Sequence, residues 1–195
     1  MVMASPARAP RRKPATLRIR PWTRAELARL PDDGNRYEVL DGRLLVTPQA
    51  SHDHQAVALR LAMLLDMYVR PAGSAHVVGP GAVPFGDNEL QPDVQVIPGA
   101  VRSGSWNDFP TPLLVVEVLS GSSRRNDLGV KLDAYSSRVG VPTVWIVDHR
   151  QREVHVCERG QAPIVERVTL VWTAPGAPDA LCLDVQEFFR TALGE

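Results

Sequence analysis

Glu117 is the residue whose surroundings have the clearest chemical consequence. It lies in residues 113–119, LLVVEVL, where every other residue is apolar. An apolar run on both alternating faces is typical of a strand that is covered on both sides. Burial alone raises the pKa of a carboxyl group by up to about 3 to 5 units. A glutamate in this position therefore needs a cation as partner or a chemical role, and an arginine at the end of the strand is the simplest alternative.

Three further residues could join Glu117 in one site. Asp93 follows a proline and opens the apolar stretch VQVIP, and Glu38 lies in an expected strand. Lys131 stands four residues before Tyr135, so the two share one face of a helix. Each has a structural alternative: a turn or cap residue for Asp93, a solvent-facing strand residue for Glu38 and a solvated helix residue for Lys131.

The basic residues of the chain are unevenly distributed between the two types. Only Lys13 and Lys131 are lysines among the 22 basic residues, and Lys13 lies in the amino-terminal tail. Lys131 is therefore the only lysine of the expected folded part. A compact ammonium group with an adjustable pKa suits a site that activates water.

The elements that must position these residues can be read from spacing and turn residues. Thr23 and Glu26 form a capping box that starts a short helix, which ends at Pro31. Asp41-Gly42 is the dipeptide of a tight hairpin turn between RYEVL and RLLVT. The remaining expected elements are helices over 54–69, about 128–138 and 184–193, and strands over 75–78, 82–85, 93–97, 113–119, 143–148, 152–158 and 164–171, with GDNELQP as a loop.

This order of elements predicts an α/β (α+β) fold with one mixed sheet and helices on its faces. The chain has 195 residues, 44% of them hydrophobic, which suits one domain over residues 21–195 after a flexible basic tail over residues 1–20. The tail contains Arg8, Arg11, Arg12 and Lys13, for which a solvated tail is favoured over phosphate contacts.

Composition excludes several classes of protein. No apolar stretch is long enough to span a membrane, and no apolar segment follows the basic start as in a secretory signal. We therefore expect a cytoplasmic protein, with Cys157 and Cys182 as two buried thiols. The net charge is zero, so any site for a polyanion must be a local patch.

Six short blocks appear in an order that resembles a known family. The blocks RYEVLDG, TPQASHDHQ, QPD, LLVVEVLS, DLGVKLDAY and GVPTVWIVD resemble those of the Uma2 family of restriction-endonuclease-like proteins, within the PD-(D/E)xK nuclease superfamily. The resemblance covers about residues 22–190. It implies a restriction-endonuclease-like fold, a mixed β-sheet flanked by helices.

The resemblance also implies the ligands of a metal ion. Asp93 matches the aspartate of the PD element, and Glu117 matches the following acid. Both would hold Mg²⁺, with Mn²⁺ as a substitute, together with the backbone carbonyl of Val118. Glu38 resembles the early acid of the family and would reach the metal through a water or position one. Hard oxygen ligands of this kind suit Mg²⁺.

The position of the lysine departs from the basic superfamily pattern. Leu119 stands two residues after Glu117, where the motif has its lysine. The resemblance assigns that role to Lys131 on the next helix, which would orient the attacking water or stabilise charge on the phosphate. Tyr135 would support Lys131 or reach a phosphate. His54 matches a family histidine, and the start of a helix explains it without a further role.

The implied reaction is hydrolysis of a phosphodiester bond in DNA by metal-activated water. One alternative is a catalytically inactive member that binds DNA or a protein partner, and another is a metal-dependent hydrolase for a different substrate. Arg36, Arg124 and Arg125 could contact phosphates. A homodimer is a possible assembly by analogy with nucleases that cut both strands. Repulsion among the acids predicts that Asp93→Asn slightly stabilises the metal-free protein while abolishing metal binding.

Overall fold

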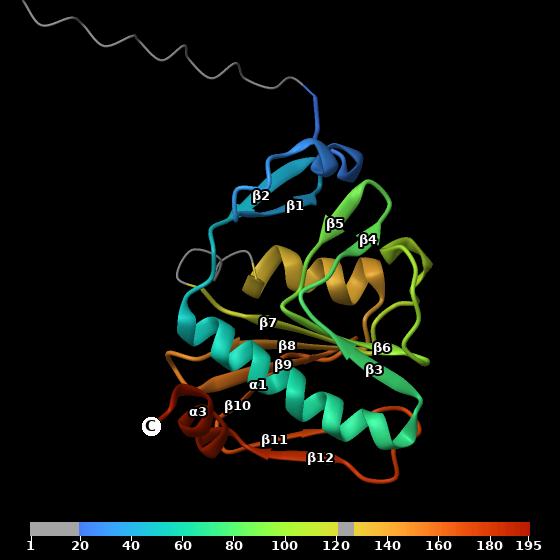
Figure 1. The fold of residues 1–195 in the computed structure, drawn as a ribbon. Coiled ribbons are helices and arrows are strands. Elements are labelled where there is room, and N and C mark those ends of the chain that lie inside the picture. The colour runs from blue at the N-terminus through green and yellow to red at the C-terminus, as the bar shows by residue number, and fades with distance from the viewer. Residues whose placement is uncertain (1–19, 121–126) are drawn as a thin grey trace, which may run out of the picture.

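A computed structural model describes residues 20–120 and 127–195 of the chain (Figure 1). The tail residues Arg8, Arg11, Arg12 and Lys13, and also Arg124 and Arg125, lie outside the described residues. The elements are η1 (Arg24–Arg29), β1 (Arg36–Leu40), β2 (Arg43–Thr47), α1 (His52–Val69), η2 (Arg70–Ala72), β3 (Ala75–Val78), β4 (Val83–Phe85), β5 (Asn88–Leu90), β6 (Val94–Pro98), η3 (Trp106–Asp108), β7 (Leu114–Val118), η4 (Asp127–Lys131), η5 (Ala134–Val139), β8 (Thr143–Asp148), β9 (Glu153–Glu158), β10 (Ile164–Glu166), β11 (Thr169–Trp172), β12 (Leu181–Asp184) and α3 (Val185–Leu193).

The strands of the described residues form three sheets. The largest has the order β10-β9-β8-β7-β6-β3, in which β7 and β8 run parallel and the other neighbours run antiparallel. A second sheet has the order β2-β1-β5-β4, and β11 pairs with β12 in a third. The α+β fold class is confirmed, and the prediction of a single mixed sheet is wrong.

Two segments account for that difference. The stretch GDNELQP, predicted as a loop, contains β5, which pairs with both β1 and β4 and so places the hairpin in a sheet of its own. The expected strand over 164–171 is divided between β10 and β11, which belong to different sheets. Short strands of three residues have too few positions to show an alternating pattern, so local sequence does not reveal them.

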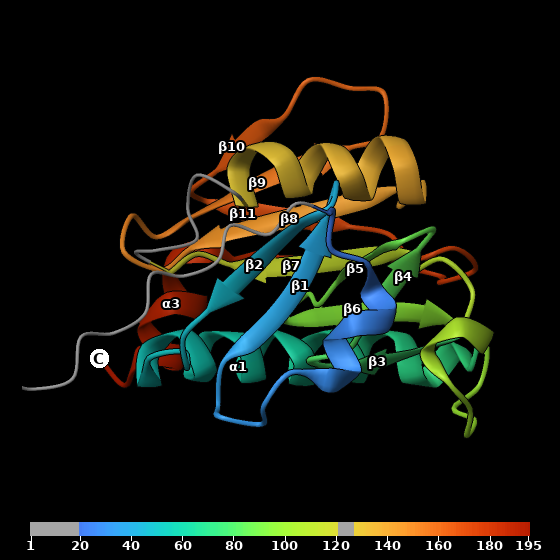
Figure 2. The same ribbon diagram turned by 90° about the horizontal axis from the view of Figure 1, so that it is seen from above.

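The six-stranded sheet lies between two helical layers (Figure 2). Val116 and Val118 of β7 belong to the core cluster that includes the buried face of α1. Val115 belongs to a second cluster, which includes Tyr135 of the helix over 127–139. Because side chains alternate along a strand, Glu117 lies on the same face as Val115, towards the helix over 127–139.

The helix over 127–139 follows β7 and is wound more widely than an α-helix. Over η4 and η5 its hydrogen bonds follow the π-type pattern, and the N–H groups of Gly140 and Val141 both donate to the carbonyl of Tyr135, at 3.0 and 2.9 Å. Gly140 ends the helix in the left-handed region at φ 83°. Wide turns of this kind occur frequently at functional sites. The helix predicted at about 128–138 is confirmed.

The two cysteines differ in environment, so the prediction of two buried thiols is wrong for one of them. Cys157 is buried, and burial raises the pKa of its thiol to about 11. Cys182 is exposed, because it lies in a two-stranded sheet where alternate side chains face solvent. No helix among the described residues is long and apolar enough to cross a membrane.

Candidate functional site

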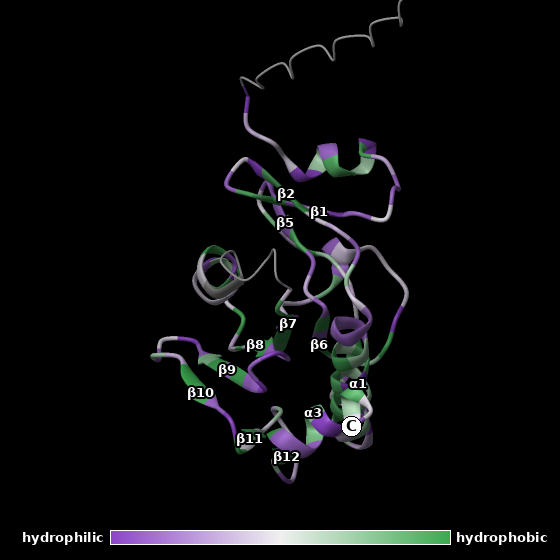
Figure 3. Ribbon diagram, turned by 90° about the vertical axis from the view of Figure 1, so that its left-hand side faces the viewer, coloured by the Kyte–Doolittle hydropathy of each residue, from purple (hydrophilic) through white to green (hydrophobic). Residues whose placement is uncertain are grey.

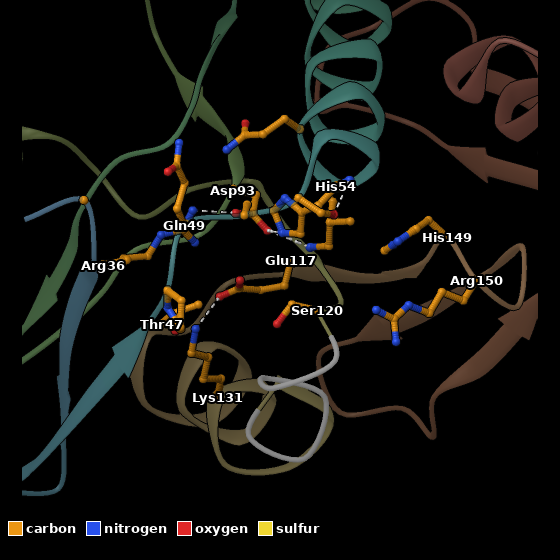
Figure 4. Close-up of a pocket in the computed structure, with 16 residues that line it drawn as sticks. Arg36, Thr47, Gln49, His54, Asp93, Glu117, Ser120, Lys131, His149 and Arg150 are labelled. Carbon is orange, nitrogen blue, oxygen red and sulfur yellow. Dashed lines mark hydrogen bonds and ion pairs between the residues drawn. The ribbon is translucent and has the colours of Figure 1, made fainter.

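A cavity of about 230 Å³ opens where β7 and β8 end, between the first turn of α1 and the helix over 127–139 (Figure 4). The carboxyl ends of parallel strands are a common place for ligand sites in α/β folds. Asp93, Glu117, Val118 and Lys131 all line this cavity. Residues that are far apart in the sequence therefore meet in one place, as the interpretation of the acids and the lysine requires.

Asp93 directly precedes β6 and is held by three donors. Arg36 Nη2 donates to Oδ1 at 2.7 Å, the backbone N–H of Val118 donates to Oδ2 at 2.8 Å, and His54 Nε2 lies 3.2 Å from Oδ2. Burial by itself raises the pKa of this carboxyl, but His54, Arg36 and the Val118 amide outweigh it, so the pKa of Asp93 is lowered. The expectation that repulsion dominates at Asp93 is therefore wrong.

Glu117 is buried, as its apolar run predicts, and a lysine is one of its partners. Its Oε1 accepts a hydrogen bond from the hydroxyl of Tyr135 at 2.8 Å and lies 3.3 Å from Lys131 Nζ. Both partners come from the inner face of the helix over 127–139, where the four-residue spacing places them together. Lys131 thus supplies a cation that this buried carboxylate needs.

Glu38 is fully buried on β1, so the solvent-facing alternative for this residue is also wrong. Its Oε1 accepts the backbone N–H of Gln91 at 2.8 Å, and its Oε2 lies 2.8 Å from Lys131 Nζ. Lys131 is itself buried and joins Glu38 to Glu117. The hairpin thus contributes an acid that holds the lysine and does not line the cavity.

Two carboxylates supply hard oxygen ligands to the cavity. Asp93 and Glu117 both line it, and they are paired with Arg36 and Lys131 respectively. A divalent cation bound between the two acids would further offset their charge. The donor types therefore suit a metal ion.

The described residues do not form a metal centre whose ligands are all protein side chains. No group of three or more His, Cys, Asp and Glu side chains within residues 20–120 and 127–195 is arranged to hold a metal ion. Mg²⁺ commonly uses only one or two carboxylates, and completes its shell with waters and substrate phosphate. Asp93 and Glu117, with Val118 beside them in the cavity, fit such an open site.

The structure adds residues that the motif did not indicate. His149 and Arg150 directly follow β8 and line the cavity together with Ser120 (Figure 4). His149 is buried, its Nδ1 has no hydrogen-bond partner among the described residues, and burial, Arg150 and His54 lower its pKa. Asp148 Oδ1 accepts the backbone N–H of Arg150 at 3.0 Å and so holds this turn in place. The sequence signal for His149 and Arg150 is that these polar residues directly follow the apolar strand TVWIVD.

Two residues that were interpreted from the sequence only as peripheral are central in the structure. Arg36, considered for phosphate contact, pairs with Asp93 and also donates to the carbonyl of Gln91 at 2.9 Å. Burial opposes its charge, but the attraction of Asp93 raises the pKa of Arg36. Ser51 caps the start of α1, because its Oγ accepts the backbone N–H of His54 at 3.3 Å, and the ring of His54 contacts Asp93. The capping role that was preferred for His54 therefore belongs to Ser51, and the His54 side chain lies in the site.

Comparison with known proteins agrees with the family resemblance found in the sequence. The model of the Uma2 family, described as "Putative restriction endonuclease", matches residues 24–186. A crystal structure titled as a putative nuclease belonging to DUF820 from Anabaena variabilis ATCC 29413 has a TM-score of 0.73 and 20% sequence identity, and covers 88% of this chain and 99% of its own. No curated protein matches the sequence.

The structural neighbour shows that the fold is that of a nuclease-like protein, at an identity too low to transfer more than the fold. The family match spans most of the chain and includes Glu38, Asp93, Glu117 and Lys131. On the strength of that match, this chain belongs to the Uma2 family.

Proposed function

We propose that this protein is a Mg²⁺-dependent endonuclease that hydrolyses phosphodiester bonds of DNA. The observation that supports the proposal best is the meeting of Asp93, Glu117 and Lys131 in one cavity, although they come from the position before β6, from β7 and from the helix over 127–139. Two carboxylates beside an ammonium group match the needs of hydrolysis at a phosphate, which are a cation site, an oriented water and positive charge near the reacting oxygens.

Asp93 and Glu117 would hold the ion, with the backbone carbonyl of Val118. When bound, the ion would lower the pKa of a water and neutralise charge on the phosphoryl oxygens. Lys131 orients the attacking water and adds positive charge near the phosphate. Glu38 holds the ammonium group of Lys131 in place, and Tyr135 fixes Glu117 through its hydroxyl. In this proposal Glu38 acts on the reaction through Lys131.

The basic wall of the cavity supplies contacts for a polyanionic substrate. His149 and Arg150 line the cavity from the end of β8, and Arg36 lines it from β1. Arg150 is exposed and can reach a phosphate beside the reacting one. This local patch is what a protein of zero net charge needs in order to bind DNA.

One observation favours a second candidate function, that of an inactive nuclease-fold protein that binds DNA or a protein partner. Both acids of the cavity are already satisfied by protein donors, and the described residues contain no closed metal centre. An ion would have to compete with Arg36 for Asp93 and with Lys131 for Glu117. Turnover is therefore the property that separates the two functions.

The test uses supercoiled plasmid, purified full-length protein, and Mg²⁺, Mn²⁺ or a chelator. We expect nicking with either metal, none with the chelator, and none with Asp93→Ala or Lys131→Ala. Glu187→Gln, an exposed acid on α3, serves as control and should nick like the wild type. Nicking that persists in both site variants would refute the proposal. Duplex binding without any nicking by the wild type would support the inactive member instead.

A further inference from the structure

Of the three donors that hold Asp93, Arg36 has the most room to move. The Val118 amide belongs to the backbone of β7, which is paired on both sides within the six-stranded sheet. The His54 side chain is 6% exposed and is fixed by the packing around it. The Arg36 side chain is 19% exposed and lines the cavity (Figure 4). A change at this carboxylate therefore starts with Arg36.

The contact with Arg36 covers the oxygen that the proposed metal site needs. Asp93 lines the cavity, yet its side chain is only 3% exposed. Arg36 Nη2 holds Oδ1 at 2.7 Å, while Oδ2 faces the Val118 amide and His54. A divalent ion at Oδ1 would share one oxygen with a guanidinium group, and two cations at such short range repel each other. The ion pair and metal binding at Asp93 therefore oppose each other.

Arg36 also has an anchor that does not depend on this carboxylate. Its Nη1 donates to the carbonyl of Gln91 at 2.9 Å, so one end of the guanidinium group stays held when Nη2 changes its partner. The other acids that act on its charge, Glu38 and Glu117, are both paired with Lys131. The strand β7, which carries Glu117, is otherwise hydrophobic (Figure 3). An anion that draws Nη2 away must therefore enter the cavity from outside.

We propose that Arg36 exchanges Asp93 for a phosphate of the substrate and thereby couples metal binding to DNA binding. This inference rests on the proposed nuclease function and adds the regulation of the same site. Without substrate, Arg36 occupies Asp93 and keeps the affinity for divalent ions low. When DNA is bound, a phosphate oxygen accepts Nη2 and leaves Oδ1 open to the ion. A guanidinium group suits this exchange, because it binds carboxylates and phosphates with the same geometry.

The coupling follows from one conformation that both ligands prefer. The ion and the DNA each bind best when Arg36 has left Asp93, so each raises the affinity for the other by the same factor. If the ion pair is favoured by about ten to one in the free protein, the apparent affinity for the ion is about tenfold lower than in its absence. Substitution of Arg36 removes the paired state, and with it both this loss of affinity and the coupling.

The first test measures the affinity of the full chain for Mn²⁺ without DNA, by electron paramagnetic resonance of the free ion. We expect Arg36→Gln to bind Mn²⁺ about tenfold more tightly than the wild type. Structural damage would weaken binding, so a gain reports the lost contact itself. Binding by Arg36→Gln that is unchanged or weaker would overturn the proposal.

Arg150→Gln is the matched control for charge. Arg150 lines the same cavity but is not among the three donors to Asp93. Its substitution also removes one positive charge, and we expect it to tighten Mn²⁺ binding less than twofold. An equal gain in both variants would assign the effect to net charge and overturn the exchange at Asp93.

The second test measures the reciprocal effect on DNA. Fluorescence anisotropy gives the dissociation constant of a labelled duplex with chelator and with Mn²⁺, in the first seconds after mixing, while a denaturing gel shows that the duplex is intact. Mn²⁺ should tighten duplex binding by the wild type about tenfold more than by Arg36→Gln. Arg150→Gln should bind the duplex more weakly and keep the coupling of the wild type. Equal coupling in the wild type and Arg36→Gln would overturn the proposal.

The outcomes also separate this proposal from the proposed function. If the wild type nicks plasmid but Arg36→Gln gains no affinity for Mn²⁺, the exchange is wrong and the nuclease function stands. If neither protein binds Mn²⁺, with or without duplex, both proposals are wrong. Should circular dichroism show that Arg36→Gln is unfolded, Arg36→Lys takes its place, because a lysine cannot bond Gln91 and Asp93 through a planar fork. Arg36→Lys should tighten Mn²⁺ binding at least threefold, and an unchanged affinity would overturn the exchange.

Discussion

Asp93→Asn tests the electrostatics of the site in a single atom exchange. The substitution keeps the size of the side chain and removes its charge, so Arg36 loses its ionic partner. Removing one member of a buried ion pair costs about 3 to 5 kcal/mol. Arg36 retains its bond to the carbonyl of Gln91 and its side chain is 19% exposed, which softens the loss. We therefore expect the metal-free variant to be less stable by about 2 to 3 kcal/mol.

The assay is urea unfolding followed by circular dichroism in the presence of a chelator, with calorimetry in parallel. A loss of this size lowers the melting temperature by roughly 5 to 10 °C for a chain of this length. Asp32→Asn, an exposed acid on the loop before β1, is the control and should leave the unfolding midpoint unchanged. Magnesium binding, measured by titration calorimetry, should be lost in Asp93→Asn and retained in the control.

The pH dependence of the free energy of unfolding tests independently whether the Asp93 carboxylate stabilises the folded protein. The folded state lowers the pKa of Asp93, so the carboxylate contributes stability above its unfolded pKa of about 3.9. That contribution is lost as the pH falls through the lowered folded value. The stability difference between wild type and Asp93→Asn should therefore be constant at neutral pH and shrink in acid. A variant as stable as the wild type at pH 7, or more stable, would refute our reading of the contacts around Asp93.

Three further substitutions test the remaining parts of the site. Lys131→Met leaves Glu38 and Glu117 without their shared cation, so it should abolish nicking and cost about 3 to 5 kcal/mol in urea unfolding; an unchanged midpoint would contradict the buried pairing. Tyr135→Phe removes one hydrogen bond to Glu117 and should cost about 1 to 2 kcal/mol, with nicking slowed but present. Arg150→Ala should change stability by less than about 0.5 kcal/mol and make duplex binding weaker and less salt-dependent, measured by fluorescence anisotropy; an unaltered salt slope would exclude a phosphate contact.

Local sequence predicted most of the elements in this chain, because the signals that specify them are short-range. Asp41-Gly42 specified the hairpin of β1 and β2, and the threonine–glutamate pair at the start of η1 predicted the bond from the Thr23 N–H to Glu26 Oε2, at 3.0 Å. The apolar spacing of α1 predicted its buried face. Each of these features depends on residues within one or two turns of one another.

The candidate acids and Lys131 were also visible in the sequence, but the contacts that each acid makes were not. The apolar run around Glu117 implied burial and a compensating group, and twenty arginines made an arginine the obvious candidate. Only the packing of the helix over 127–139 on the sheet brought Lys131 and Tyr135 to that carboxylate. Likewise, the three donors on Asp93 come from β1, α1 and β7, so no local pattern could reveal them.

The sequence by itself determined the local elements, the family and the residues able to do chemistry, since each rests on residue type and short spacing. Tertiary structure decided the division into three sheets, the sign of the electrostatics at Asp93, and the wall formed by His149 and Arg150. These properties depend on distances between groups from different elements. Such distances follow from how the sheets and helices pack, and a one-dimensional pattern does not contain them.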